Sequence, residues 1–161
     1  MDIKSMGPRK GQYNQGMFRP SKPEKYVGNL NEIIFRSSWE LKFMKFLDTS
    51  NNIVKWNSEG LFIPYLSPLD HRGHRYFIDF TVVTVDQDGV PTVWLIEIKP
   101  TKFIVKPEAP KRMTDKATKN YLYSAKQYII NQAKFEAARE YCKQKGLKFG
   151  IVTENFILKG I

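Results

Sequence analysis

The chain has 161 residues, 42% of them hydrophobic and 14% aromatic, so it is long and apolar enough to fold as one packed domain. Lys and Arg number 26 against 16 Asp and Glu, and the resulting net charge of +10 attracts polyanions, most commonly nucleic acid. A basic protein with no nucleic-acid role is the alternative.

The single cysteine excludes an intrachain disulfide. No apolar run approaches the roughly 20 residues that span a membrane. The opening segment also lacks a secretory signal, so we expect a cytoplasmic protein with no membrane partner.

The beginning of the chain differs in composition from the rest. Residues 1–25 hold Gly, Pro, Gln and six Lys or Arg, with little hydrophobic periodicity. We therefore expect residues 1–25 to form an extended basic arm, which either lies on DNA or is a solvated tail. A folded domain is expected over residues 26–161.

The hydrophobic pattern predicts two helices among several strands. The first helix covers residues 37–48, where Ser37 or Ser38 is the N-cap and Glu40 has the spacing of a capping box. A long second helix spans residues 120–145 and stops at a glycine. Strands are predicted over residues 53–56, 61–65, 76–85, 92–99 and 147–153. An Asp-Gly pair between the third and fourth strands predicts a hairpin turn. This order indicates an α/β fold with a mixed central sheet flanked by helices.

Two acids and a lysine lie at the end of the predicted hairpin. Asp79 belongs to the segment YFIDF, and Glu97 and Lys99 belong to LIEIK. Glu97 and Lys99 are two residues apart on a strand, so their side chains point to the same face of the sheet. Asp79, from the neighbouring strand, places a second carboxylate beside Glu97. Charged groups on an apolar strand are costly to bury without partners, so we interpret the three residues as a candidate active centre.

These three side chains have the chemistry of a divalent-metal site. Two close carboxylates repel each other, and Mg²⁺ relieves that repulsion while it keeps several water ligands. Such an ion polarises a phosphate and lowers the pKa of a bound water. Lys99 can orient that water or stabilise the charge that develops on the phosphate. The alternative is a non-catalytic ion-paired cluster on the exposed face of a sheet.

Five segments carry a resemblance to a known family. The D…ExK spacing after a helix that bears a glutamate resembles the PD-(D/E)XK nuclease superfamily. More closely, the segments together resemble the phage head-completion nucleases of T4-like myoviruses, which are similar to the endonuclease subunit of heteromeric transposases. From about Tyr26 to Glu154 the segments are RSSWELKFMKFLD, IVKWNSEGLFIPY, HRYFIDF, LIEIKP and FGIVTE. The proline before the motif aspartate is Ile78 here, a position that shapes the strand and supplies no ligand.

The resemblance implies a fold, an activity and a set of site residues. It implies a restriction-endonuclease-like core that cuts double-stranded DNA with Mg²⁺, for which Mn²⁺ substitutes. It further implies completion of the packaged phage head, in the host cytoplasm or on the virion, with capsid or neck proteins as partners. By position, Asp79 and Glu97 match the metal-binding acids, and Lys99 matches the motif lysine. Glu40 matches an acid on the first helix that adds a ligand or holds a metal-bound water. A capping-box role for Glu40 is the alternative, and the two roles need not exclude each other.

Basic residues near this centre are candidates for binding DNA. Arg36 precedes the first helix and either contacts a phosphate or braces Glu40. A basic segment follows the ExK strand, at the natural place for a loop that grips phosphates, with a solvated loop as the alternative. The members of this basic segment are Lys102, Lys106, Lys111, Arg112, Lys116 and Lys119.

Two other functions compete with the nuclease hypothesis. A structural head or neck protein would keep the fold and bind DNA without cutting it, but it would have no need of Asp79, Glu97 and Lys99. A transposase endonuclease subunit would act with a partner, and such subunits usually carry a further DNA-binding domain, for which 161 residues leave no room. The sequence therefore favours a small metal-dependent DNA endonuclease.

Overall fold

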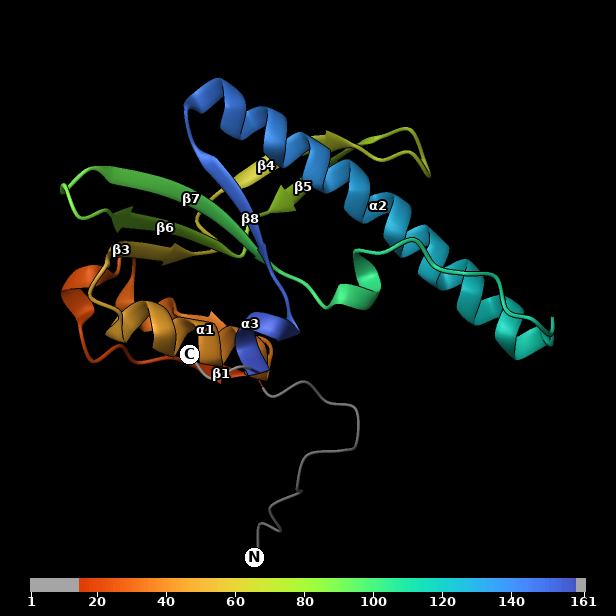
Figure 1. Cartoon of the computed structure of the whole chain (residues 1–161), viewed down its shortest axis with the longest axis horizontal. Coiled ribbons are helices and arrows are strands. Elements are labelled where there is room, and N and C mark those ends of the chain that lie inside the picture. Colours follow the sequence, from red (N-terminus) through yellow and green to blue (C-terminus); the bar gives the residue numbers. More distant parts are fainter. Residues whose placement is uncertain (1–14, 159–161) are drawn as a thin grey trace, which may run out of the picture.

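A computed structural model describes residues 15–158, and Figure 1 shows how their helices and strands are arranged. The helices are α1 (Ser38–Thr49), α2 (Asp115–Lys145) and α3 (Glu154–Leu158), and short 3₁₀ turns are η1 (Pro23–Lys25), η2 (Leu30–Glu32) and η3 (Thr101–Phe103). The strands are β1 (Gly16–Met17), β2 (Ile34–Phe35), β3 (Ile53–Ser58), β4 (Phe62–Leu66), β5 (Gly73–Phe77), β6 (Phe80–Val85), β7 (Pro91–Ile98) and β8 (Lys148–Val152). Over this range, no helix has the length and apolar character needed to cross a membrane.

The central sheet has the strand order β3-β6-β7-β8. β6 and β7 pair antiparallel through the predicted hairpin, and β8 pairs with the other side of β7 in parallel. β7 is therefore an inner strand, in agreement with its nearly continuous apolar run. Parallel neighbours need a long connection, and α2 supplies it between β7 and β8. The predicted α/β fold, with a mixed central sheet flanked by helices, is confirmed.

The segment over residues 76–85, predicted to be one strand, is two strands that belong to different sheets. β3 and β6 pair in the central sheet. The chain that continues from β3 forms β4, and the chain that leads into β6 forms β5, and these two strands pair in a separate hairpin. Between the two ladders, the N–H of Glu59 donates to the carbonyl of Asp79, and the N–H of Ile78 donates to the carbonyl of Leu61. Glu59 has a φ of 52°, in the left-handed region, so the ribbon bends here. Apolar alternation continues through the bend, which is why the sequence pattern did not reveal it.

One face of the central sheet is covered by α1 and α3 (Figure 1). α1 directs Phe43, Met44 and Leu47 at the sheet, and this spacing is that of a helix with one apolar side. They pack with Trp56 of β3 and Phe80 of β6, and each of the five side chains is at most 3% exposed. Burying a large apolar side chain stabilises the fold by roughly 1.5–3 kcal/mol, so this face supplies much of the stability of the domain.

α2 crosses the opposite face of the sheet, and its N-terminal half extends beyond the sheet (Figure 1). Ala138 and Cys142 of α2 pack with Leu95 of β7 in a second apolar cluster. This cluster is smaller than the one under α1, and the candidate active centre adjoins it. The two faces of the sheet therefore differ, with the larger apolar core on the α1 side.

The beginning of α2 differs from the prediction. The helix starts at Asp115, inside the segment that we expected to be a loop, and not at Asn120. Thr114 is the N-cap, and its Oγ1 accepts a hydrogen bond from the N–H of Ala117 at 3.2 Å. Asp115 also places a negative charge in the first turn, where the helix dipole favours it. The predicted stop is correct, because Gly146 ends the helix with a φ of 69°.

Residues 15–25, which we assigned to the basic arm, lie on the domain. Phe18 is buried in the core under α1. Lys25 is also buried, and its ammonium donates to three backbone carbonyls at the end of α1, at 2.6, 2.9 and 2.8 Å. The last carbonyls of a helix lack helical partners and favour a cation, so Lys25 caps α1. The rest of the expected arm, residues 1–14, lies outside the described residues, and the division into arm and domain stays a prediction.

Candidate active site

The candidate active centre lies at the end of β7, on the face of the sheet that α2 covers. Leu95 packs with α2, and Ile98 packs in the core under α1, so the alternation of a strand places Glu97 and Lys99 on the α2 side. Lys99 Nζ lies 2.9 Å from Glu97 Oε1, and Glu97 is only 5% exposed. The predicted position of these two side chains on one face is confirmed.

Glu97 has a second partner, which the sequence analysis missed. Tyr76, buried on β5, donates from its hydroxyl to Glu97 Oε2 at 2.9 Å. Burial, and then the charge of Glu97, raise the pKa of Tyr76, so the hydroxyl stays protonated and remains a donor. With a partner on each carboxylate oxygen, Glu97 is held in one orientation. The available signal was a polar-tipped aromatic residue at a buried position of HRYFIDF, three residues before the aspartate.

Asp79 lies at the bend immediately before β6, and not within the strand as we predicted. β6 pairs with β7 as far as the pair Phe80 and Ile96. Beyond this pair the ribbon turns away, and the Asp79 carboxylate meets β7 in its place. Asp79 Oδ2 accepts a hydrogen bond from the N–H of Ile98 at 2.8 Å. The bend therefore anchors the Asp79 carboxylate to the strand that carries Glu97.

The negative charges of Asp79 and Glu97 repel each other. Burial, and then the charge of Glu97, raise the pKa of Asp79 well above its usual range, while the Ile98 N–H and Lys99 only partly compensate. A divalent cation between two such carboxylates would remove this penalty. Because Mg²⁺ binds with one or two carboxylates and several waters, Asp79 and Glu97 fit a divalent ion.

Lys134 of α2 is a further basic side chain at this centre. Its ammonium lies 5.4 Å from the centroid of the Tyr76 ring. Burial, and then Lys99, lower the pKa of Lys134, whereas Glu97 and Asp79 act in the opposite direction. Lys134 therefore shares the electrostatic environment of the other three charged residues. Lys134 was not among the predicted site residues, although a lysine within the sheet-facing part of a long helix was an available signal.

Glu40, the predicted third acid, is engaged in the cap of α1. Ser37 Oγ accepts from the Glu40 N–H at 3.1 Å, so Ser37 is the N-cap, and it donates to Glu40 Oε1 at 3.2 Å. The predicted capping box forms only in part, because its second bond would come from the backbone N–H of Ser37. Glu40 Oε2 accepts from the N–H of Arg36 at 2.8 Å. Its charge contributes to the raised pKa of Asp79, but within residues 15–158 no three His, Cys, Asp or Glu side chains form a group that could hold a metal ion. The structure does not join Glu40 to Asp79 and Glu97 in such a group.

The predicted DNA-binding residues are all exposed, but they are not all near this centre, because the last of them lie at the start of α2, on the part of the helix that extends beyond the sheet (Figure 1). Arg36 Nη1 forms an exposed ion pair with Glu59 Oε1 at 2.7 Å, and Glu59 lies at the bend between β3 and β4. The backbone N–H of Arg36 donates to the Glu40 carboxylate, as one of the two predicted roles of Arg36 required. The basic segment after β7 is exposed at every predicted position: Lys102, Lys106, Lys111, Arg112, Lys116 and Lys119. Because α2 begins early, the last two of these residues are on the helix and not in a loop.

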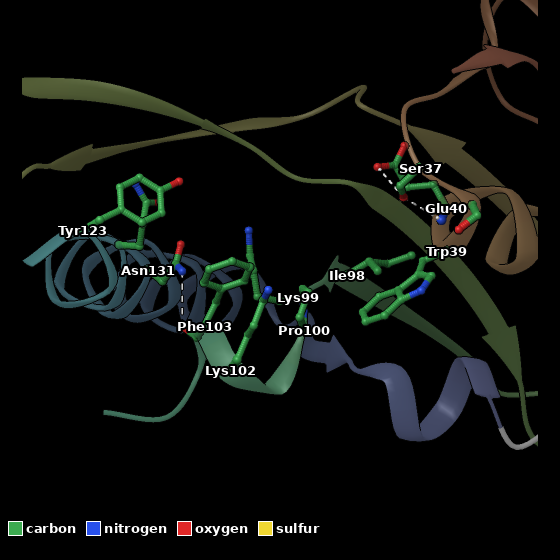
Figure 2. Close-up of a pocket in the computed structure, with 12 residues that line it drawn as sticks. Ser37, Trp39, Glu40, Ile98, Lys99, Pro100, Lys102, Phe103, Tyr123 and Asn131 are labelled. Carbon is green, nitrogen blue, oxygen red and sulfur yellow. Dashed lines mark hydrogen bonds between the residues drawn. The ribbon is translucent and has the colours of Figure 1, made fainter. Parts of the chain in front are cut away.

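A cleft of about 660 Å³ opens beside the candidate active centre (Figure 2). Trp39 and Glu40 of α1 lie on one side, and Phe103 of η3 and Tyr123 of α2 lie on the other. Lys99 lies between the two sides, so it belongs both to the cleft and to the ion pair with Glu97. The cleft therefore adjoins the centre through Lys99, whereas Asp79 and Glu97 do not line it.

Comparisons with known proteins agree with this geometry. Residues 50–154 match the family model described as TnsA-like endonuclease N terminal. The chain is also similar to the head completion nuclease of Enterobacteria phage T4, with 33% identity over 140 residues, which cover 87% of this chain and 91% of that protein. The matched range includes Asp79, Glu97, Lys99 and Lys134, whereas Glu40 precedes it. A restriction-endonuclease-like core, as predicted, is consistent with this match.

Proposed function

Because the chain belongs to the TnsA-like endonuclease family, we propose that it hydrolyses phosphodiester bonds of double-stranded DNA with a divalent metal ion, Mg²⁺ or Mn²⁺. The observation that carries the proposal is the pair of repelling carboxylates, the half-buried Asp79 and the buried Glu97, with Lys99 bound to Glu97. Crowded carboxylates of this kind cost stability unless a ligand uses them, and strongly shifted pKa values gather at functional sites. Asp79 and Glu97 would hold the ion.

The side chains of the centre have separate tasks in this proposal. When bound, the metal ion would polarise the phosphate and lower the pKa of a water molecule. Tyr76 fixes the orientation of Glu97 through its 2.9 Å hydrogen bond. Lys99, 2.9 Å from Glu97, lies at the cleft and would stabilise negative charge that develops on the phosphate. Lys134 adds a second positive charge from α2.

The exposed basic segment after β7 is the proposed grip on the DNA backbone. Each phosphate contact releases counterions, so the affinity should fall with salt at a log–log slope of roughly −0.9 per contact. Neutralising Lys106, Lys111 and Arg112 together should flatten that slope. Lys143 and Lys145, exposed at the other end of α2, are the matched control, and their neutralisation should leave the slope unchanged. A slope that is unaffected by the first set would remove this segment from the DNA interface.

The relationship to a phage head completion nuclease supports a biological setting. We place the activity in the completion of a packaged phage head, in the host cytoplasm or on the virion. Capsid or neck proteins would then present the DNA to the enzyme. A structural head protein that binds DNA without cutting it is the alternative, and the fully engaged Glu40 carboxylate is the observation that favours it.

One incubation separates the enzyme from the structural protein. Purified protein is mixed with supercoiled plasmid in Mg²⁺, Mn²⁺, Ca²⁺ or a chelator, and nicked and linear products are resolved on an agarose gel. We expect cutting with Mg²⁺ and Mn²⁺, none with chelator, and poor cutting with Ca²⁺, whose looser coordination positions water less strictly. Asp79→Asn protein is the control for a contaminating nuclease. If wild-type protein cuts no DNA with either Mg²⁺ or Mn²⁺, the structural alternative is correct.

A further inference from the structure

The cleft beside the active centre has the size of a small-ligand pocket and is too small to enclose a DNA duplex. Its volume of about 660 Å³ lies within the roughly 300–1,000 Å³ of pockets that enclose small ligands, so it has room for one or two nucleotides. Its sides come from α1 on one hand and from η3 and α2 on the other, with the end of β7 between them (Figure 2). A ligand in the cleft would therefore touch three separate parts of the fold, next to Lys99.

The sides of the cleft present aromatic rings. Trp39 lies on the α1 side, and Phe103 and Tyr123 lie on the other side (Figure 2). Tyr123 is 61% exposed on the part of α2 that extends beyond the sheet. Its ring therefore contributes little to the core. Trp39 and Phe103 are half-buried, and Trp39 also packs against the core under α1, so Tyr123 offers the most accessible ring. Aromatic rings beside positive charge are the usual platform for unpaired bases, because every base has a face that can stack.

Positive charge lies next to these rings. The Lys102 ammonium is 4.9 Å from the centroid of the Phe103 ring, and Lys99 lies between the two sides of the cleft. An exposed lysine over an aromatic ring can move to a phosphate and leave that ring to a base. One nucleotide offers both a base for the rings and a phosphate for the lysines. A base that is stacked within a duplex offers the rings no free face.

The aromatic platform is held in place by α2. Asn131, buried on α2, donates from its side-chain amide to the carbonyl of Phe103 at 3.3 Å. Gln132, the next residue, donates to the carbonyl of Ile104 at 3.4 Å. These amides dock η3 on the helix that carries Tyr123, so Phe103 and Tyr123 keep their relative positions. The platform is part of the folded domain and exists before DNA binds.

We propose that this cleft binds one or two unpaired nucleotides, whose bases stack on Tyr123, Phe103 and Trp39. This inference rests on the proposed nuclease function and narrows its substrate. The enzyme would prefer DNA in which a duplex meets a single-stranded segment, such as an overhang or a fork. The unpaired strand would enter the cleft, and the phosphate beside it would lie at Lys99.

The test measures binding without cutting. Fluorescently labelled DNA is titrated in chelator as a blunt duplex and as the same duplex with a single-stranded overhang, and affinity is read from anisotropy. Wild-type protein should bind the overhang DNA more tightly. Tyr123→Ala should weaken overhang binding by about 5-fold to 150-fold, the cost of a lost base–aromatic stack, and leave blunt-duplex binding unchanged. Tyr123→Phe should retain the wild-type affinity, because the ring remains.

Leu122 supplies a matched control on the same helix. It is 51% exposed and does not line the cleft, so Leu122→Ala should bind both DNAs as wild type does. Equal affinity of wild-type protein for both DNAs, or an equal loss on both with Tyr123→Ala, would overturn the proposal. Because the assay needs no metal, its outcome is separate from that of the plasmid experiment. Protein that cuts plasmid but shows no Tyr123 effect retains its nuclease function and loses this substrate preference.

Discussion

The environments of two aspartates, the buried Asp48 and the half-buried Asp79, differ in how far the protein compensates a negative charge. Asp48, near the end of α1, accepts hydrogen bonds from Ser21 Oγ at 2.5 Å and from the N–H groups of Ser21 and Lys22 at 2.8 and 3.0 Å. Burial alone would raise the pKa of Asp48, but these donors outweigh burial and hold the pKa below its usual value. Asp79 accepts a backbone hydrogen bond at 2.8 Å but faces Glu97, and its pKa is raised.

The difference separates a carboxylate that stabilises the fold from one that is kept for a ligand. Around Asp48 the protein supplies the donors that water would have supplied, so the charge ties the N-terminal segment to α1. Around Asp79 the protein adds a second carboxylate and compensates it incompletely. A fold tolerates such a local conflict where function requires it, and the larger apolar core on the α1 side offsets its cost.

The largest effect should come from Asp79→Asn. We expect cleavage to fall on the order of 10⁴-fold, as for the loss of a central catalytic group, because a ligand and a negative charge are removed together. Without metal, the variant should be as stable as wild type or more stable, because the repulsion with Glu97 disappears and an amide oxygen can still accept from the Ile98 N–H. Plasmid cleavage and thermal melting in chelator measure the two effects. A variant that melts well below wild type would contradict the assignment of Asp79 to a ligand role.

Asp48→Ala should give the opposite result, with a large cost in stability. Hydrogen bonds to a charged group contribute roughly 1.5–3 kcal/mol each, and the variant leaves the Ser21 and Lys22 donors without their acceptor. We expect the free energy of unfolding to fall by about 3 kcal/mol, measured by urea denaturation. Cleavage per folded molecule should stay at the wild-type level.

The pH dependence provides a check on the same residue. Because the folded-state pKa of Asp48 is lowered, its contribution to stability is complete above the unfolded-state pKa of about 3.9. That contribution disappears as the pH falls through the folded-state pKa. The difference in melting temperature between wild type and Asp48→Asn should therefore be largest near neutral pH and shrink in acid. A difference that grows in acid would mean that the pKa of Asp48 is raised.

Tyr76→Phe should have an intermediate effect, on activity. The substitution keeps the buried ring and removes the hydroxyl that holds Glu97 Oε2. Loss of an outer partner of a metal-binding carboxylate typically costs 10-fold to 100-fold, and we expect a decrease in that range. If cleavage by the variant stays at the wild-type level, Tyr76 only packs in the core. Phe77→Leu, at the exposed next position on β5, is the control and should cut as wild type does.

The sequence predicted the fold and the central carboxylates because both depend on local patterns. The helix over residues 37–48, the inner strand β7 and its hairpin partner follow from hydrophobic periodicity and turn residues. Glu97 and Lys99 are two residues apart on one strand, so their common face follows from the geometry of a strand alone. These expectations needed no knowledge of the tertiary structure.

The remaining features depend on contacts between distant segments. The bend that places Asp79 beside β7 involves Glu59, which has a left-handed backbone conformation. A single residue of this kind does not alter the hydrophobic periodicity of the sequence. Tyr76 and Lys134 reach the centre from a separate hairpin and from α2, and only the packing of these elements brings them together. The early start of α2 followed a local signal, the Thr114 cap, which the basic and proline-rich character of the segment concealed.

The smallest effect should come from Glu40→Gln. This variant tests whether Glu40 stabilises the fold, as Asp48 does, or serves the ligand, as Asp79 does. Like Asp48, Glu40 is met by protein donors, since Arg36 N–H and Ser37 Oγ both donate to its carboxylate. Unlike Asp48, it lines the cleft, and its charge contributes to the raised pKa of Asp79. A glutamine removes the charge and keeps one of the two acceptor oxygens, while Ser37 Oγ still caps the N–H of residue 40.

We expect Glu40→Gln to change the free energy of unfolding by less than about 0.5 kcal/mol, because the cap remains. Cleavage should fall less than about tenfold, because the oxygens of Glu40 are already engaged at the start of α1. Glu40→Ala is the comparison variant, and it should lose about 1 kcal/mol, because both hydrogen bonds to the carboxylate disappear while the Ser37 cap remains. Cleavage by Glu40→Gln that falls as far as that of Asp79→Asn would instead make Glu40 a third ligand, brought to the metal only when the ion and DNA are bound.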